Sequence, residues 1–483
     1  MIPERLQPLV AETAEVAARF EAAGRRLFLV GGVVRDLIVN RFTDERDLDF
    51  ATDARPEEIE AIVTGWADAV WLQGKRFGTI GFRKGGRDHE VTTFRAEAYV
   101  PESRKPEVEF ADDLEADLSR RDFTINAMAL SLPDMTLVDP FGGVADLVAK
   151  RLRTPLDPAV SFTDDPLRMV RAARFIAGYS MVPEPAVTAA VASHHDRLAI
   201  VSVERVRDEL DKLIVVDDPG PGLWFIATTG LAAEFLPELP GLALEQDPIH
   251  RHKDVLAHTI AVVGNTSSDR LLRLAALFHD VGKPKTRAIG PGGVSFHHHE
   301  VVGVRMTRER MHALKYSSDD VDVVSTLVEL HLRFHTYKMG WTDRAVRRYV
   351  RDAGPLLDRL NELTRADCTT RNAAKARALA RRMDELEERI AELRAREELD
   401  ALRPELDGRQ VMERLGIGPG PDVGRALAFL LDLRLDEGVL GADEAGRRLD
   451  EWWAAQQQSS VPLLARLEDD GSGDEAVGVA PPG

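Results

Sequence analysis

Two aspartates separated by one residue are the first candidates for chemistry in this chain. Asp47 and Asp49 flank Leu48 in the segment DLDFAT, which the residue types predict to be extended. On a β-strand, residues i and i+2 point to the same face, so both carboxylates converge on one spot. Carboxylate oxygens are hard ligands that suit Mg²⁺, the ion of phosphoryl and nucleotidyl transfer. The alternative interpretation is a solvated strand edge.

A glycine pair lies shortly before these aspartates. The run LFLVGGVVRDLIV predicts a strand, a break at Gly31 and Gly32, and an apolar-periodic helix that begins near Arg35. Glycine has no Cβ, so its backbone can come close to a phosphate at the start of a helix. Alone, the pair is typical of an ordinary turn. Followed by the two aspartates, it favours a metal-dependent site for phosphoryl or nucleotidyl transfer.

The segment DDPLR at 164–168 has the residue types needed to read a base. Adenine and cytosine present an amine donor beside a ring-nitrogen acceptor, whereas guanine and uracil present a carbonyl beside an N–H donor. A carboxylate accepts from the amine while a guanidinium donates to the ring nitrogen. Asp165 and Arg168 could therefore admit A and C and reject G and U, because the rejected bases would leave buried polar groups unpaired. The alternative is simply a well-capped helix with a basic face.

A second set of candidates is rich in histidine. His279 and Asp280 follow the apolar segment LLRLAALF and precede a break at VGKP. A His-Asp pair at a helix end, joined by ligands from other helices, can bind one or two divalent ions and activate water. The predicted ligands are His258, His279, Asp280, His299 and Asp367. His331 is a further possible ligand, the neighbouring His297 and His298 leave the register of His299 open, and the alternative is a set of structural histidines.

The elements that carry these residues fall into several domains, because 483 residues exceed what one core supports. Strand-like and helical segments alternate up to about residue 155, and amphipathic helices broken by Pro and Gly follow. RRDFTINAMA, at 120–129, is predicted to be helical. The predicted division is 1–155, 156–245, 246–370, 371–466 and an acidic, disordered tail at 467–483.

Composition excludes several classes of protein. No apolar run approaches the roughly 20 residues of a membrane span, and the N-terminal segment resembles an amphipathic helix with acidic residues rather than a signal peptide. Cys368 is the single cysteine, so no disulfide forms within the chain. These features predict a cytoplasmic protein.

The net charge of −18 would seem to disfavour nucleic acid as a partner. Nucleic acid is bound by local patches, however, and two basic clusters are present. The first places Arg344, Arg347, Arg348 and Arg351 at i, i+3, i+4 and i+7, on one helix face. The second comprises Arg371, Lys375, Arg377, Arg381 and Arg382. They predict RNA binding, the alternative being solvated helix faces.

The motifs GGVVRD, DLD, RRDFTINAMA, DPFGG, DDPLR and VSVERVRDELDKLI, in this order, resemble those of the tRNA nucleotidyltransferase and bacterial poly(A) polymerase branch of the polymerase β superfamily. The histidine-rich segment resembles the HD phosphohydrolase superfamily. The resemblance implies an α+β multidomain protein. It would have a polymerase β-type nucleotidyltransferase α/β head, followed by all-α neck, HD and C-terminal arm domains, the arm binding RNA.

The resemblance also implies roles for individual residues. Asp47 and Asp49 would hold catalytic Mg²⁺, and Glu90, in a predicted strand, is proposed as a third carboxylate although it could simply be solvated. The implied nucleotide-binding residues are Gly32, Arg35, Arg121, Asn126, Asp165, Arg168, Arg171 and Arg174. Divalent ions of unspecified identity would occupy the histidine site. The family pattern has Glu where this chain has the shorter Asp164.

The implied reaction is template-independent addition of CCA to tRNA 3′ ends from CTP and ATP. The loop at 96–110 resembles one that helps relatives accept ATP after CTP, which argues against an enzyme that adds only C. The alternatives are a poly(A) polymerase of the same branch, an alarmone synthetase/hydrolase, and a non-catalytic RNA-binding protein. In the alarmone enzymes the hydrolase precedes the synthetase, the reverse of the order here.

Overall fold

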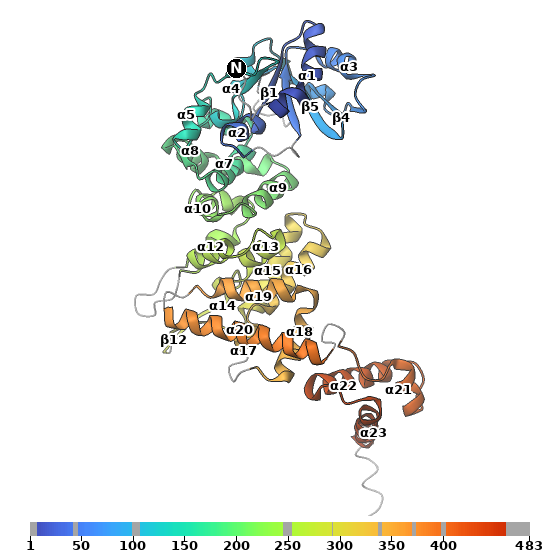
Figure 1. Ribbon diagram of the computed structural model, residues 1–483. Coiled ribbons are helices and arrows are strands. Elements are labelled where there is room, and N and C mark those ends of the chain that lie inside the picture. Colours follow the sequence, from blue (N-terminus) through green and yellow to red (C-terminus); the bar gives the residue numbers. More distant parts are fainter. Residues whose placement is uncertain are drawn as a thin grey trace, which may run out of the picture. The chain divides into compact units, whose positions relative to one another are not determined.

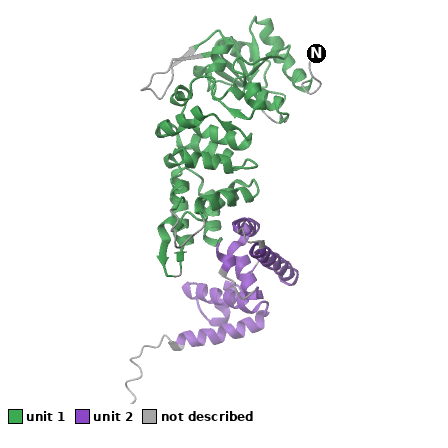
Figure 2. Cartoon of the chain, turned by 90° about the vertical axis from the view of Figure 1, so that its left-hand side faces the viewer, with its two compact units in different colours: residues 1–331 green, residues 332–483 purple. Residues whose placement is uncertain are grey.

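The computed structural model describes residues 7–41, 47–98, 107–244, 254–291, 293–336, 341–369, 373–397 and 402–459. The chain forms two compact units, 1–331 and 332–483 (Figure 2). The boundary between the units falls inside the segment 246–370 that was predicted to be one domain. The predicted tail at 467–483 lies outside the described residues.

A seven-stranded sheet forms the first part of unit 1, with strand order β3-β4-β5-β2-β1-β8-β9 (Figure 1). Its strands are β1 (Leu27–Val30), β2 (Leu48–Thr52), β3 (Ala69–Trp71), β4 (Thr79–Lys84), β5 (Arg87–Thr93), β8 (Ala129–Leu132) and β9 (Thr136–Val138). β2 and β5 pair in parallel and the other neighbours are antiparallel. The strands predicted at LFLV, at DLDFAT and around Glu90 are confirmed as β1, β2 and β5.

The helices of this part are α1 (Gln7–Ala22), α2 (Gly32–Ile38), α3 (Pro56–Val63), α4 (Leu114–Ser119) and α5 (Gly143–Val148). The hairpin of β6 (Arg95–Ala98) and β7 (Glu107–Phe110) forms a separate small sheet. One core cluster brings Phe28 and Val30 of β1 against Phe94 and against Leu118 of α4. Apolar side chains of the strands and of α4 thus pack together at the sheet. This packing determines where the polar side chains of the same elements point.

The prediction that RRDFTINAMA is helical is wrong. Helix α4 ends at Ser119, a 3₁₀ turn covers Thr124–Asn126, and strand β8 follows. The carboxylate of Asp122 accepts hydrogen bonds from the backbone N–H of Phe123 and from Asn126 Nδ2, which stabilises the turn. The apolar residues after it pair with β1, where Val30 lies opposite Ala129. Tertiary pairing therefore overrides the local helical pattern.

Helices make up most of the rest of unit 1 (Figure 1). They are α6 (Pro158–Asp164), α7 (Leu167–Gly178), α8 (Pro185–His194), α9 (Val203–Ile214), α10 (Gly220–Thr228), α11 (Glu238–Gly241), α12 (Val255–Asn265), α13 (Arg270–Phe278), α14 (Lys283–Thr286), α15 (His299–Ala313) and α16 (Ser318–Leu330). Two short strand pairs, β10 (Arg151–Leu152) with β11 (Val182–Pro183) and β12 (Arg287–Gly290) with β13 (Gly293–Phe296), interrupt them. Side chains of Asp254, Asp269 and Ser317 cap α12, α13 and α16, so these helices begin where the sequence supplies an acceptor.

Unit 2 is helical in its described residues. Its helices are α17 (Arg333–Thr336), α18 (Asp343–Ala353), α19 (Leu357–Asp367), α20 (Ala373–Arg396), α21 (Gly408–Leu415), α22 (Pro421–Glu437) and α23 (Ala442–Ser459). The long helix α20 carries the charged run ARRMDELEERIAELRAR. Val411, Ala426, Leu430 and Leu449 form a core that joins α21, α22 and α23. Across the described ranges of both units, no helix has the length and apolar character to cross a membrane.

Candidate active site and metal centre

Three carboxylates meet at the parallel pair of strands in the head sheet. Asp49 on β2 lies opposite Glu90 on β5, so their side chains share one face, and Asp47 precedes β2 and is exposed. The Asp49 side chain is accessible from a cavity and is otherwise surrounded by protein. Its reduced solvation raises its pKa to about 6, with attraction from Arg121 opposing and repulsion from Glu90 and Asp47 adding to the shift. Crowded carboxylates with a raised pKa are suited to bind a divalent cation.

The cavity in front of these strands has a volume of about 830 Å³ and continues to the helices that follow the head. Its charged lining residues are Arg35, Asp49, Glu90, Arg95, Asp117, Arg120, Arg121, Asp122, Asp164, Asp165, Arg168, Arg171, Arg174 and Arg205. Eight of these are arginines, so the cavity concentrates positive charge in a chain whose net charge is −18. This charge distribution suits a polyanion such as a triphosphate.

Gly31 and Gly32 form the floor of the cavity next to the carboxylates. Gly31 adopts a φ of +77°, and a Cβ there would lie 3.3 Å from Arg121 Nη1 and 3.9 Å from Asp49 Oδ2. Only glycine combines this backbone conformation with so close an approach of neighbouring polar groups. Arg121 itself bonds Asp117 Oδ2 at 3.3 Å and keeps a side chain that is one-quarter exposed.

The structure holds Arg35 and Asn126 in a buried network. The Arg35 guanidinium donates to both Asp36 oxygens, at 2.9 and 3.0 Å, and to Asn126 Oδ1 at 2.6 Å. Tyr179 donates to Asp36 Oδ1 at 2.7 Å, and its ring lies 4.3 Å from the Arg35 guanidinium. Burial lowers the pKa of Arg35. Both predicted nucleotide-binding residues line the cavity, and Asp36 links their network to Tyr179, which follows α7.

Arg171 and Arg174 enter the cavity from α7 and are held by two buried acids. Arg171 Nη2 lies 2.6 Å from Asp122, and Arg174 Nε donates to Glu209 Oε2 at 2.7 Å. Burial would raise the pKa of Asp122, but the charge and hydrogen bond of Arg171 and the bonds from Asn126 and Phe123 outweigh it and lower that pKa. Glu209 lies on α9, so this helix braces the arginines of the cavity.

Of the predicted base-reading pair, Asp165 lies between α6 and α7, and Arg168 is in the first turn of α7. Asp165 Oδ1 accepts from the N–H of Leu167 at 3.1 Å, and its other oxygen lies 3.3 Å from Arg205 Nη2. Arg168 is buried and donates to Ser161 and to a backbone carbonyl. Both residues line the same cavity as Asp49 and Glu90. The arrangement thus puts the hydrogen-bonding pair and the acidic cluster at one site.

Four residues that line the cavity or contact its lining side chains were not predicted from the sequence. Ser161 contacts the reader arginine from α6, and Arg205 contacts Asp165 from α9. Arg95 and Arg120 line the cavity from β6 and from the end of α4. Arg205 lies four residues before Glu209 in a strongly amphipathic helix, which was a usable signal. Nothing local distinguishes Ser161, because its role depends on the loop that brings α6 next to α7.

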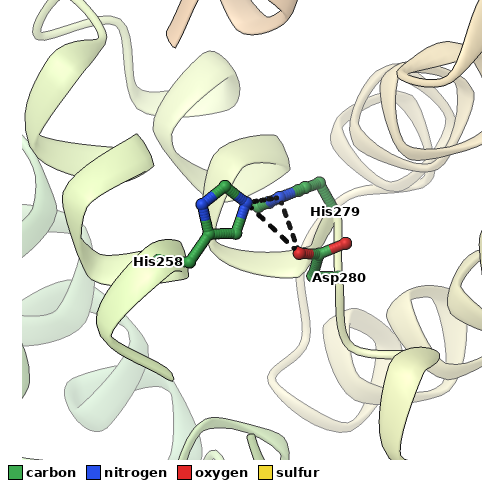
Figure 3. Close-up of side chains that lie close together, drawn as sticks. All are labelled: His258, His279 and Asp280. Atoms are coloured by element: carbon green, nitrogen blue, oxygen red, sulfur yellow. Dashed lines mark hydrogen bonds and ion pairs between the residues drawn. The ribbon is translucent and has the colours of Figure 1, made fainter. Parts of the chain in front are cut away.

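The histidine-rich segment forms a buried cluster within unit 1. His258 comes from α12, His279 and Asp280 follow α13, and their ligand atoms converge (Figure 3). His299 at the start of α15 and His331 after α16 complete a second group that shares Asp280. The two oxygens of Asp280 divide between the groups: Oδ2 lies 3.1 Å from His279 Nε2, and Oδ1 lies 3.3 Å from His299 Nε2.

The hydrogen bonds of the rings indicate that this cluster is built for cations. Nδ1 of His279, His299 and His331 each lies within 2.8 Å of a backbone carbonyl, so these nitrogens carry the proton and leave Nε2 as a lone pair. Nε2 of His279 faces Nε2 of His258 at 3.3 Å, and His299 faces His331 likewise. Facing lone pairs need a shared metal ion or proton. The donor set therefore fits divalent cations, which His258 and His279 would hold in one group and His299 and His331 in the other, with Asp280 common to both.

Asp367, also predicted as a ligand, is in neither group. It belongs to unit 2, at the end of α19, where its charge acts on His335. The assignment of Asp367 therefore stays a prediction, whereas His331, named from the sequence as a further ligand, joins His299 and Asp280 in the second group. Lys283, in the segment VGKP, forms an ion pair with Asp280 at 2.5 Å.

The predicted RNA-binding arginines of α18 form ion pairs within unit 2. Arg347 bonds Glu397 at 2.8 and 2.9 Å, Arg344 and Arg348 both pair with Asp436, and Arg351 pairs with Asp352. These contacts support packing of α18 against its neighbours. Of the second cluster, Arg371 lies outside the described residues, whereas Lys375, Arg377 and Arg381 are exposed on α20.

Three family models match successive parts of the chain. The Poly A polymerase head domain matches residues 27–153, the probable RNA and SrmB-binding site of polymerase A matches 180–242, and the HD domain matches 255–393. The first covers the sheet with its carboxylates, and the last covers the histidine cluster.

Curated relatives agree with these matches. An A-adding tRNA nucleotidyltransferase of Deinococcus radiodurans is 34% identical over 447 residues, which span 89% of this chain and 96% of the relative. A CCA-adding enzyme of Bacillus licheniformis is 40% identical over 49% of this chain and 57% of the relative. The chain thus aligns with little more than half the length of that CCA-adding enzyme.

Solved structures share the fold. The Bacillus stearothermophilus CCA-adding enzyme in complex with CTP superposes with a TM-score of 0.68 at 24% identity, covering 95% of this chain and all of the other. The Thermotoga maritima CCA-adding enzyme complexed with tRNA has a TM-score of 0.59 at 17% identity and covers 94% of this chain and 96% of that chain.

Proposed function

This chain belongs to the tRNA nucleotidyltransferase family, and we propose that it adds CCA to tRNA 3′ ends from CTP and ATP without a nucleic-acid template. The observation that carries the proposal is a single cavity lined both by Asp49 and Glu90 and by Asp165 and Arg168. One pocket therefore combines an acidic centre for transfer with a pair of side chains that matches A and C. A cytoplasmic location is part of this proposal.

The residues divide the work by position. Arg121, Arg171 and Arg174 neutralise the triphosphate, while Asp165 accepts from the base amine and Arg168 donates to the ring nitrogen. Asp47 and Asp49, with Glu90 beside them, would hold Mg²⁺, which supplies Lewis-acid stabilisation of charge at the reacting phosphate. The 3′-hydroxyl of RNA attacks the α-phosphate in line, the bond to the β-phosphate oxygen breaks, and pyrophosphate leaves.

Product length on a tRNA transcript that lacks its 3′ CCA tests the proposal. With Mg²⁺, CTP alone should add two nucleotides, and CTP with ATP should add three. The A-adding relative makes addition of A alone the specific second candidate. An enzyme of that kind would not use CTP, and would add one A only to a transcript that already ends in CC. A long tail from ATP alone would instead indicate a poly(A) polymerase.

Replacement of the first aspartate tests the metal assignment. Asp47→Ala removes an exposed carboxylate that makes no packing contact in the core, so the fold should persist while transfer falls by about a thousandfold or more. The measurement is the single-turnover rate with saturating CTP, accompanied by circular dichroism. A rate near that of the unchanged protein would contradict the assignment of Asp47.

A second activity is favoured by the facing imidazole nitrogens of unit 1. We propose that the histidine cluster binds divalent transition metals and hydrolyses phosphate esters at RNA ends. Four histidines and one carboxylate form a nitrogen-rich set, which favours Mn²⁺, Fe²⁺, Ni²⁺ or Zn²⁺ over Mg²⁺. Metal analysis of the purified protein, followed by hydrolysis of a nucleotide phosphate ester with each metal, tests both parts. A purified protein that takes up none of these metals would contradict this second proposal.

A further inference from the structure

The guanidinium of Arg168 is held from behind by groups that take no part in binding the base. Only 9% of the residue is exposed, and Ser161, its partner on α6, is 3% exposed. Nη1 donates to Ser161 Oγ at 2.9 Å and to the carbonyl of Ser161 at 3.2 Å. Nη2 donates to the carbonyl of Arg120, at the end of α4. Two elements distant in sequence therefore grip one side chain.

These bonds leave a defined part of the guanidinium for the substrate. An arginine has five N–H donors in a rigid planar fork. Three are used by Ser161 and Arg120, so the remainder point in a direction that the grip sets. Asp165, the other member of the pair, is oriented by the N–H of Leu167 and by Arg205. The relative placement of donor and acceptor is thus fixed before a nucleotide enters.

Selection by hydrogen bonds requires such fixing. Uracil and guanine present an N–H where cytosine and adenine present a lone pair, so they meet the guanidinium donor to donor. A guanidinium that could swing away would avoid this clash and let water satisfy the wrong base. A held guanidinium cannot, and the wrong base then pays the full cost of unpaired polar groups.

We propose that Ser161 is a positioning residue for base selection, acting through Arg168. The proposal rests on the proposed function, because it concerns how that reaction chooses its nucleotides. Its hydroxyl is the side-chain part of the grip, and the two carbonyls cannot be altered without moving the backbone. Ser161 also lies three residues before Asp164, the position at which the family pattern has the longer Glu.

The test compares nucleotide selection in three variants. Ser161→Ala removes the hydroxyl, Ser161→Thr keeps it, and Ser193→Ala is the matched control. Ser193 is an exposed serine on α8 whose hydroxyl bonds only neighbouring groups of its own helix. For each, kcat/KM is measured with CTP, ATP, UTP and GTP on tRNA lacking CCA, together with inhibition by inorganic tripolyphosphate.

Ser161→Ala should lower the preference for CTP over UTP, and for ATP over GTP, by about tenfold. Inhibition by tripolyphosphate should stay unchanged, since the triphosphate is bound by other arginines, and a merely structural defect would change it. Ser161→Thr should restore the preference, and Ser193→Ala should not alter it. Unchanged selection by a folded Ser161→Ala protein would overturn the inference, whereas failure of the unchanged protein to use CTP or ATP would overturn the proposed function itself.

Discussion

The pKa of Asp49 links the acidic centre to solution conditions. Asp49 loses solvation in the cavity and faces Glu90 across the parallel strands, so its pKa rises from 3.8 to about 6. In the metal-free protein a raised pKa means that protonation favours the folded state. The stability contributed by this group is complete below pH 3.8 and is lost as the pH rises through about 6. A bound cation has the opposite pH dependence, because it binds the ionised carboxylate.

Proton and Mg²⁺ should therefore compete at Asp49. Below pH 6 the Mg²⁺ concentration that gives half the maximal rate of CTP addition should rise by about tenfold for each pH unit. Glu90→Gln removes one repelling charge and should move the onset of this rise to lower pH. Asp88→Asn is the control, since Asp88 is paired with Arg83 on the exposed side of the strand. A Mg²⁺ requirement independent of pH between 5 and 7 would contradict the assignment.

Residue-level prediction succeeded where spacing on one element determines position. Asp49 and Asp280 were found because a strand alternates and because a His-Asp pair ends a helix. It missed Ser161, whose contact with Arg168 depends on how α6 and α7 meet, and the assignment of Asp367 stays a prediction. Asp367 lies in unit 2, and His331, from the end of α16, reaches the cluster. Periodicity within α16 does not predict that His331 reaches the cluster, because this contact depends on how α16 packs against α15 and α13.

At the scale of elements, the arginine stripe of α18 shows how one pattern supports two interpretations. Spacing at i, i+3, i+4 and i+7 correctly predicts a shared face, but it does not say what covers that face. Arg347 is buried and bonds Glu397, whose side chain is 10% exposed, and a backbone carbonyl near the end of α22. Arg344, Arg347 and Arg348 thus pair with other parts of unit 2, whereas Arg351 pairs with Asp352 on α18 itself.

Arg347→Met should loosen unit 2, because it leaves Glu397 buried without its partner. Breaking a buried pair costs about 3 kcal/mol, which corresponds to roughly hundredfold faster hydrogen exchange in α18 and α22. Arg344→Met, at a side chain that is 56% exposed, should change exchange by less than about threefold. The measurement is hydrogen–deuterium exchange of the full chain by mass spectrometry. Equal effects of the two variants would show that burial does not decide the role of these arginines.

The head sheet contains both strands that the sequence predicts and a segment, RRDFTINAMA, that it does not. The strands around Asp47 and Glu90 could be predicted, since alternating apolar residues and β-branched types agree with their final state. RRDFTINAMA could not, because its apolar residues fit a helix face as well as they fit the turn and strand β8. Pairing with β1 decides between the two, and that pairing joins residues about 100 positions apart. In the observed turn, the side chains of Asn126 and Arg121 line the cavity.

At the scale of unit 1, α9 connects the two candidate sites. One side of this helix holds Glu209, which bonds Arg171 and Arg174 of the nucleotide cavity. Asp211, on the same helix, accepts from the Tyr316 hydroxyl at 2.6 Å and lies 3.4 Å from Arg270. Arg270 begins α13 and Tyr316 follows α15, whereas the histidine ligands occupy the opposite ends of these helices. The contacts of Asp211 with Tyr316 and Arg270, here called the joint, therefore lie at the helix ends opposite to His279 and His299.

This arrangement predicts that the two sites work independently. His279→Ala should abolish uptake of Mn²⁺ or Ni²⁺, measured by mass spectrometry of bound metal after chelation and reloading. The rate of CTP addition should change by less than about twofold, because α9 is fixed by Tyr316 and Arg270 whether or not metal is bound. Tyr316→Phe, which removes a hydrogen bond of the joint itself, is the matched comparison and should lower that rate more than His279→Ala does. If His279→Ala slowed CTP addition as strongly, metal occupancy would be transmitted along α13 to the nucleotide cavity, and the helix ends could not be treated as independent.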